Sequence, residues 1–357
     1  MSGIKIIAEA GVNHNGSLAM ALELIDLAAE AGADFVKFQT FKSEKVISRY
    51  ASKAEYQKAT TGEQDSQLEM VKKLELSPED HMSLLKHCAK RGIGFMSTPF
   101  DLGSLDFLVG TLHVDTIKVA SGELTNAPFL YAVGRTQRPI ILSTGMATLG
   151  EVERALSLLA LAYVNPTQEV HERSMTQAFV SPKGQAALKE KVSLLHCTTE
   201  YPAPFEEVNL RAMQTLSAAF GLTVGYSDHT PGIAVSLAAA ALGACLIEKH
   251  FTLDKTLPGP DHQASMSPDE LRGLVKGVRE IELALGNGVK IPQRSEIKNI
   301  DIARRSIVAA ERIQKEDVFT SHNLDFKRPG TGLSPFRYWE LIGTKAKQDF
   351  QEDEVIF

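Results

Sequence analysis

The stretch IKIIAEAGVNHNGSLAMALELIDLAAEAGADFVKFQTF, residues 4–41, has the pattern of a strand, a helix and a second strand. Ile4–Ala8 and Phe35–Phe38 are short apolar, β-branched runs of the kind that form strands. Between them, Ser17 can cap the N-terminus of a helix and Gly32 suits its C-terminal end. A strand, a covering helix and a further strand are typical of a parallel sheet, so this stretch predicts an α/β fold.

The same alternation continues along most of the chain. Eight runs are candidate strands: Ile4–Ala8, Phe35–Phe38, Ile93–Met96, Thr116–Val119, Ile140–Leu142, Val192–Leu195, Leu222–Tyr226 and Cys245–Glu248. A (β/α)8 barrel, or TIM barrel, needs eight such units and usually takes about 250 residues. We therefore predict a TIM-barrel domain over residues 1–290.

Three segments depart from this repeat. Residues 291–357 contain short β-like runs and turns, which predicts a linker and a small β-rich domain. A domain of this size has little core of its own, so we expect it to pack on the barrel or on a second subunit. Residues 41–77 are too long for a plain loop and predict a lid over the barrel mouth. Residues 163–190 form a polar insertion, in which Ser181 and Pro182 can open a short helix.

The composition narrows the class of protein. The 357 residues include 38 Lys and Arg against 44 Asp and Glu, and the net charge of −6 disfavours binding to nucleic acid or to anionic membranes. No apolar stretch approaches the roughly 20 residues of a membrane span, and Glu9 interrupts any signal-peptide core, so we expect a cytoplasmic protein. Cys88, Cys197 and Cys245 are widely spaced and odd in number, which argues against disulfides.

Polar residues gather at the carboxyl ends of the predicted strands, the face that carries the active site in barrel enzymes. In chain order they are Glu9, Asn13, His14, Lys37, Gln39, Ser97, Thr98, Lys118, Ser121, Glu123, Ser143, Thr144, His196, Thr198, Tyr201, Ser227, Asp228, His229, Glu248, Lys249 and His250. Taken singly, each has a plain structural explanation. Their common position predicts a site.

Lys37 and Lys118 share their strand ends with hydroxyl and amide groups. Two lysines in such surroundings suit a phosphate or a carboxylate in a low-dielectric mouth. The alternatives are structural ion pairs, or Schiff-base chemistry on a desolvated lysine.

His229 and His250 follow adjacent predicted strands and can converge on one ion, although a pair of histidines is a weak metal signature. An open site of this kind suits a Lewis acid better than structural zinc. Asp261 in the turn PGPD can hydrogen-bond a polyol, and Arg328 precedes a Pro-Gly turn. Both turns also have a purely structural interpretation.

Ten sequence blocks carry a resemblance to a known family. They are IAEAGVNHNGS, VKFQTF, STPFD, IKVASGE, ILSTGM, LLHCTTEYPAP, GYSDHT, EKHFTLDK, PGPDH and KRPGTG. From about Ile4 to the C-terminus, the chain resembles the sialic acid synthase family, whose members condense phosphoenolpyruvate with an N-acylated hexosamine. The resemblance implies a TIM barrel followed by an antifreeze-like (SAF) domain, and a homodimer in which that domain covers the partner's barrel.

The resemblance also implies roles for individual residues. Those for the phosphate and carboxylate of phosphoenolpyruvate are Lys37, Thr98, Lys118, Ser121, Ser143 and Ser227. Those for the sugar are Gln39, Glu123, Tyr201, Asp261 and Arg328. The resemblance assigns the divalent metal, Mn²⁺ or Mg²⁺, to His229 and His250. It places Glu9 near the reacting carbons. The chain has Thr199 where some relatives carry a phosphate-contacting asparagine.

We expect first a synthase of N-acetylneuraminate from N-acetylmannosamine. The alternative is an N,N'-diacetyllegionaminate synthase that uses 2,4-diacetamido-2,4,6-trideoxymannose. Two other classes stay open: a Schiff-base lyase acting through Lys37 or Lys118, and a non-enzymatic sugar-binding barrel.

Overall fold

Eight parallel strands form the first part of the chain in a computed structural model that describes residues 3–62 and 64–357. The strands are β1 (Lys5–Gly11), β2 (Phe35–Thr40), β3 (Gly94–Pro99), β4 (Ile117–Val119), β5 (Ile140–Ser143), β6 (Val192–Cys197), β7 (Thr223–Asp228) and β8 (Leu246–His250). Their order is β3-β2-β1-β8-β7-β6-β5-β4, and β3 and β4 lie side by side. The sheet is thus a nearly closed barrel, which confirms the predicted fold.

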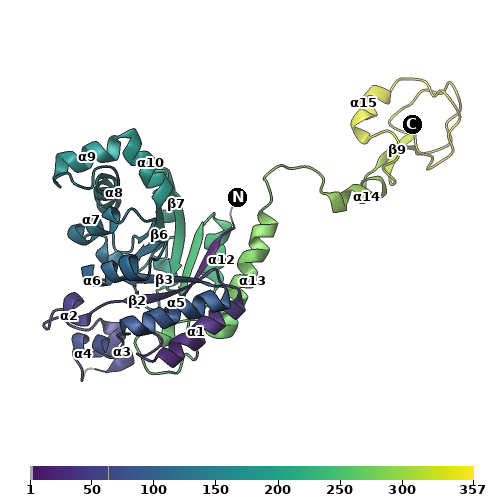
Figure 1. Ribbon diagram of the computed structural model, residues 1–357. Coiled ribbons are helices and arrows are strands. Elements are labelled where there is room, and N and C mark those ends of the chain that lie inside the picture. Colours follow the sequence, from purple (N-terminus) through teal and green to yellow (C-terminus); the bar gives the residue numbers. More distant parts are fainter. Residues whose placement is uncertain (1–2, 63) are drawn as a thin grey trace. The chain divides into compact units, whose positions relative to one another are not determined.

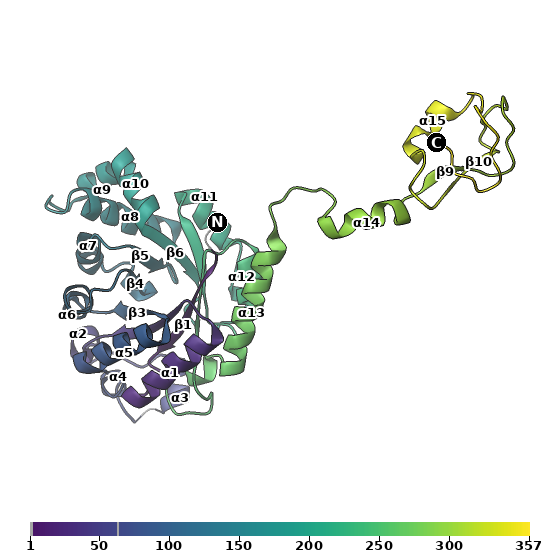
Figure 2. The same cartoon turned by 45° about the vertical axis from the view of Figure 1, so that its right-hand side comes forward.

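Helices surround the strands (Figures 1 and 2). They are α1 (Leu18–Ala31), α5 (Pro78–Arg91), α6 (Leu102–Asp106), α7 (Ala127–Arg135), α8 (Leu149–Val164), α11 (Ala212–Phe220), α12 (Ala234–Ala241) and α13 (Pro268–Leu285). The predicted ends of α1 are confirmed: Ser17 accepts a hydrogen bond from the Met20 amide, and Gly32 is left-handed with φ 82°. The main core lies between these helices and the sheet, where Leu24, Ile25 and Val36 are fully buried.

Shorter helices fill the two long connections. Residues 41–77 contain α2 (Ser43–Val46), α3 (Glu55–Thr61) and α4 (Gln67–Lys72), whereas residues 163–190 contain α9 (Glu172–Val180) and most of α10 (Pro182–Lys191). Helices α9 and α10 pack against α8. Ser181 caps α10 as predicted, because its side chain accepts a hydrogen bond from the Gly184 amide.

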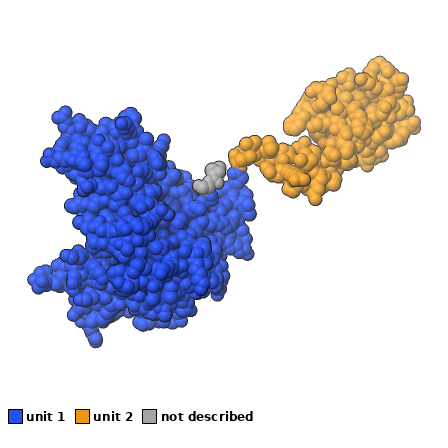
Figure 3. Space-filling model, viewed as in Figure 1, with its two compact units in different colours: residues 1–286 blue, residues 287–357 orange. Residues whose placement is uncertain are grey.

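The chain divides into two compact units, which are coloured separately in Figure 3: unit 1 ends at Gly286, and unit 2 runs from Asn287 to Phe357. Unit 2 contains α14 (Arg294–Ala303), the antiparallel pair β9 (Ser306–Ala309) and β10 (Leu324–Lys327), and α15 (Tyr338–Leu341). It has a small core of its own, made by Ile307, Ala309, Ile313, Phe319, Leu324, Ala346, Phe350 and Ile356. Among the described helices of both units, none is long and apolar enough to cross a membrane.

Candidate active site

The barrel interior is built in two layers, and the lower layer is apolar. It consists of Ile7, Met96, Ile141, Leu195 and Leu246, which form one buried cluster. Side chains two residues apart on a strand point to the same face, so the next interior position on each strand lies one layer higher. Those positions hold Glu9, Thr98, Ser143, Cys197 and Glu248. The site therefore rests on an apolar floor.

Lys37 occupies the same upper layer on β2 and meets two carboxylates. Its Nζ lies 2.8 Å from Oε2 of Glu9 and 3.6 Å from Oε2 of Glu248. It also donates a hydrogen bond to Oγ1 of Thr98 over 3.1 Å. The strand register explains this meeting, because Glu9 pairs with Lys37 on one side and with His250 on the other.

Lys118 lies beside the second carboxylate oxygen of Glu248. Its Nζ lies 3.5 Å from Oε1 of Glu248 and donates to Oγ of Ser143 over 2.8 Å. Ser227 donates to the same Glu248 oxygen over 3.0 Å. Glu248 is thus the shared partner of both lysines. Sequence reasoning noted it at a strand end but assigned it no role, although its place two residues before His250 puts both on one face of β8.

Burial and nearby charges shift the pKa values of the two carboxylates, Glu9 and Glu248, in opposite directions. Burial raises the pKa of Glu9 to about 7, since the opposing attraction of Lys37 is weaker. Burial also acts to raise the pKa of Glu248, but the ammonium groups of Lys118 and Lys37 outweigh it and lower that pKa to about 2. Glu248 is therefore the firmly ionised carboxylate of the pair.

His229 and His250 come together as predicted, with ring centroids 5.7 Å apart. Nδ1 of His229 lies 2.6 Å from the Thr198 carbonyl oxygen, which can only accept, so Nδ1 carries the proton and Nε2 keeps its lone pair. Burial lowers the pKa of His229 to about 4, and it also lowers the pKa of His250 well below its usual value. Both imidazoles are thus neutral at pH 7.

Two observations test whether this pair fits a divalent metal. Nδ1 of His250 is buried without a hydrogen-bond partner in the described part of the chain, as expected of a nitrogen that serves as a ligand. Residues 3–62 and 64–357 contain no group of three or more His, Cys, Asp or Glu placed to hold an ion. Two neutral imidazoles therefore fit an open site in which water or substrate oxygens supply the remaining ligands.

These groups line a cavity of about 180 Å³ at the barrel mouth, here called the lysine cavity. Its lining includes Glu9, Lys37, Gln39, Thr98, Phe100, Lys118, Ser121, Ser143, Cys197, Thr199, Tyr201, Ser227, His229, Glu248 and His250. The structure thus brings together most of the residues named from the sequence. Cys197, one of the three widely spaced cysteines, also faces this cavity.

The hydroxyls of Ser121 and Thr199 both lie close to Gly145, a position with no room for a larger side chain. Ser121 opens a short 3-10 helix, Ser121–Glu123, and its Oγ accepts a hydrogen bond from the Gly145 amide over 3.0 Å. A Cβ atom on Gly145 would lie 2.3 Å from Oγ1 of Thr199 and 2.8 Å from Oγ of Ser121. Gly145 is therefore required for both hydroxyls to reach the cavity.

Three predicted sugar residues lie outside the lysine cavity. Asp261 lines a second cavity of about 260 Å³, and burial raises its pKa to about 6. Glu123 accepts a hydrogen bond from Asn126 and lines neither cavity. Arg328 belongs to unit 2, where its Nε donates to the Ala303 carbonyl.

Some polar residues at strand ends point away from the mouth. Asp228 and Lys249 pair across β7 and β8 and form a buried ion pair of 3.0 Å. Ser236 of α12 donates to Asp228 over 2.6 Å, so this pair faces the helices. His196 likewise turns to the Val208 carbonyl. These three strand-end residues stabilise the scaffold and do not line the lysine cavity.

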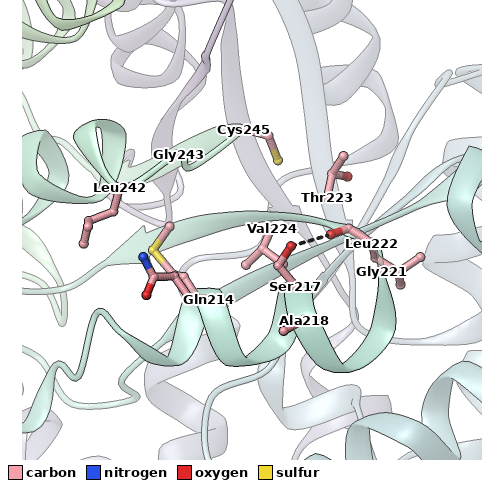
Figure 4. A pocket seen from close by; sticks show the side chains of 11 residues that line it. Gln214, Ser217, Ala218, Gly221, Leu222, Thr223, Val224, Leu242, Gly243 and Cys245 are labelled. Atoms are coloured by element: carbon pink, nitrogen blue, oxygen red, sulfur yellow. Dashed lines mark hydrogen bonds between the residues drawn. The ribbon is translucent and has the colours of Figure 1, made fainter. Parts of the chain in front are cut away.

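A larger hollow of about 550 Å³ lies between α11 and the starts of β7 and β8 (Figure 4). Gln214, Ser217, Thr223 and Cys245 supply its polar atoms, and Ser217 is bonded to the Leu222 carbonyl. Its lining contains no Lys, Arg, Asp, Glu or His among the described residues. Because it lacks convergent charged groups, the lysine cavity is the better candidate site despite its smaller volume.

Comparison with known proteins decides the family. Residues 24–290 match the model of the NeuB family, and residues 304–357 match that of the SAF domain. The chain belongs to the NeuB family. This is the sialic acid synthase family that the ten sequence blocks resemble, so the resemblance is confirmed.

Individual NeuB relatives match over nearly the whole chain. The N,N'-diacetyllegionaminic acid synthase of Campylobacter jejuni subsp. jejuni serotype O:2 is 51% identical, covering 98% of both chains. That of Legionella pneumophila subsp. pneumophila is 46% identical, covering 96% of this chain and 90% of the relative. The crystal structure of N-acetylneuraminic acid synthetase from Leptospira borgpetersenii serovar Hardjo-bovis, in complex with citrate, has a TM-score of 0.67 and 35% identity, covering 84% of this chain and 90% of that one.

Proposed function

We propose that this NeuB-family protein condenses phosphoenolpyruvate with 2,4-diacetamido-2,4,6-trideoxymannose and water, giving N,N'-diacetyllegionaminate and phosphate. The lysine cavity supports the phosphoenolpyruvate half of this proposal. The sugar rests on the relatives that are 51% and 46% identical, both named N,N'-diacetyllegionaminic acid synthases. These relatives favour the alternative from the sequence, an N,N'-diacetyllegionaminate synthase, over the N-acetylneuraminate synthase that we expected first.

In this proposal, Lys37 and Lys118 bind the anionic groups of phosphoenolpyruvate together with the hydroxyls of the upper layer. Those hydroxyls belong to Thr98, Ser121, Ser143 and Ser227. Charge-assisted hydrogen bonds in a water-poor cavity are strong enough to hold a small anion despite the acidic protein. All of these groups except Ser121, which opens the short helix after β4, lie on five rigid strands, and this arrangement fixes the orientation of the substrate before the sugar reacts.

The bond changes follow from this placement. C3 of phosphoenolpyruvate attacks the aldehyde carbon of the open-chain sugar, so a carbon–carbon bond forms and positive charge develops at C2. Water adds at C2, and one of its protons goes to the former aldehyde oxygen. The bond between C2 and the phosphate oxygen then breaks as the C2 hydroxyl loses its proton to the departing phosphate and becomes the carbonyl of the product. Glu9 stabilises the cation and orients the water. A divalent metal, Mn²⁺ or Mg²⁺, held by His229 and His250 would polarise the aldehyde oxygen.

We also propose a homodimer in which unit 2 covers the lysine cavity of a partner subunit. The resemblance of both segments to the family supports this arrangement. Arg328 would then serve the partner's sugar site.

Purified protein with phosphoenolpyruvate and Mn²⁺ tests the function when each sugar is offered in turn. We expect faster phosphate release with 2,4-diacetamido-2,4,6-trideoxymannose than with N-acetylmannosamine, and loss of activity with EDTA. Faster release with N-acetylmannosamine would restore our first expectation. An adduct trapped by borohydride with pyruvate, at Lys37 or Lys118, would instead indicate a Schiff-base lyase.

A further inference from the structure

The second cavity, here called the lid chamber, continues from the lysine cavity, and Gln39, Phe100, Tyr201 and His250 line both. Residues between Phe41 and Leu74, from the predicted lid, form one part of its lining, here called the lid wall, and Pro260 and Asp261, from the loop after β8, form another. His250 and the other three shared residues therefore lie where the two cavities meet.

The lid wall of this chamber is mostly apolar. Val46, Ile47, Met70, Val71 and Leu74 line it. Met70 and Leu74 are 6% and 8% exposed, so both are packed in place. Such a wall favours methyl groups and penalises hydroxyls that find no hydrogen-bond partner there.

Two side-chain amides interrupt the apolar wall. Gln57 of α3 and Gln67 of α4 both line the chamber, and Nε2 of Gln67 lies 3.5 Å from Oε1 of Gln57. A carboxamide offers a donor and an acceptor, which matches the amide of an acetamido group. The lid wall contributes no charged side chain from the described residues, so a neutral group fits it better than an anion.

We propose that the lid chamber selects the sugar, and that it does so by its C4 and C6 substituents. In this assignment Gln67 hydrogen-bonds the C4 acetamido group, and Met70 and Leu74 pack against the C6 methyl group. This assignment rests on the proposed function and names the part of the site that distinguishes one sugar from another. N-acetylmannosamine lacks the C4 acetamido group, and its C6 hydroxyl would face Met70 and Leu74, whose side chains offer it no good hydrogen-bond partner.

Matched variants test this assignment. Met70→Ala removes part of the apolar wall, and Met213→Ala removes an equally buried methionine of α11 that does not line the chamber. We expect Met70→Ala to lower kcat/KM for the trideoxy sugar about tenfold and for N-acetylmannosamine by less than about twofold. Gln67→Leu should show the same selective loss, while the KM of phosphoenolpyruvate stays constant in every variant.

Sugar binding, measured by calorimetry, separates failure of this inference from failure of the proposed function. If wild-type protein binds the trideoxy sugar and Met70→Ala and Gln67→Leu weaken that binding selectively, the chamber assignment stands even if no phosphate is released. Equal losses with both sugars, or losses no greater than in Met213→Ala, would overturn it while leaving the reaction intact. No binding of the trideoxy sugar by wild-type protein would also overturn it.

Discussion

Replacing Glu248 by glutamine should change stability and ligand affinity in opposite directions. Glu248 lies 3.6 Å from Nζ of Lys37 and 3.5 Å from Nζ of Lys118, and all three side chains are buried. Lys37 keeps Glu9 as a partner in the variant, whereas the hydrogen-bond partners left to Lys118 in the described part of the chain are the neutral oxygens of Val119 and Ser143. The loss of stability therefore comes mainly from Lys118.

The size of the effect follows from the distances. At 3.5 Å and an effective dielectric constant of about 20, one unit-charge pair contributes about 5 kcal/mol. Removing one partner of a buried pair costs about 3 to 5 kcal/mol, so we expect that loss in the free energy of unfolding of metal-free protein. Phosphoenolpyruvate should bind about tenfold more tightly, or by about 1.4 kcal/mol, because both ammonium groups lose a competing carboxylate.

Denaturant unfolding and calorimetry in EDTA measure the two quantities. Asp34→Asn is a suitable control, because Asp34 pairs with Arg279 over 2.7 Å in a partly exposed position. This substitution should lower the free energy of unfolding by about 1 kcal/mol and leave the affinity for phosphoenolpyruvate unchanged. A Glu248→Gln protein that is as stable as wild type, or that binds phosphoenolpyruvate more weakly, would refute the reasoning.

Three further predictions concern the metal, pH and the second unit. His229→Ala and His250→Ala should each abolish turnover and lower Mn²⁺ affinity, measured by electron paramagnetic resonance, without changing the unfolding midpoint by more than a few degrees; wild-type metal affinity in either would exclude the pair. Burial raises the pKa of Asp261 from 3.8 to about 6. The folded state then binds the proton more tightly, so this group should destabilise the protein by about 2 kcal/mol as pH rises from 4 to 7; Asp261→Asn should remove that slope, and an unchanged slope would contradict the burial argument. Arg328→Ala and His229→Ala should each be inactive, yet activity should return when their subunits exchange, because a mixed dimer has one site free of both defects; no recovery despite exchange, shown by mass spectrometry, would exclude action in the partner's site.

The fold was predictable because its signals are local. Each strand is a short apolar run, and α1 has its caps at Ser17 and Gly32, so neither depends on distant contacts. The ends of strands were less accurate. β1 continues to Gly11, and its pairing with β2 contains a register shift between Glu9 and Gly11 that no local sequence pattern predicts.

The site was only partly predictable, because a position at a strand end does not say which way a side chain points. Asp228 and Lys249 alternate with Ser227 and Glu248, so one pair faces the helices and the other the cavity. Which of the two alternating sets of side chains faces the barrel interior depends on how the whole barrel closes. The role of Glu248 depends on two lysines from strands distant in sequence, so it became evident only in three dimensions.

The two-layer interior also determines where the chain tolerates insertions and deletions. Neighbouring positions of a strand face opposite sides, so deleting one residue within the lower half of β1 or β8 would exchange the two sides. Glu9 and Glu248 would then enter the helix-facing core, and Ala10 and Lys249 would take their interior places at the mouth. A residue added beyond the strand ends, in the segment that carries α2 to α4, leaves this alternation untouched. Variation in length among enzymes built on this plan should therefore be concentrated above the upper layer, where it leaves the buried lysines and carboxylates in place.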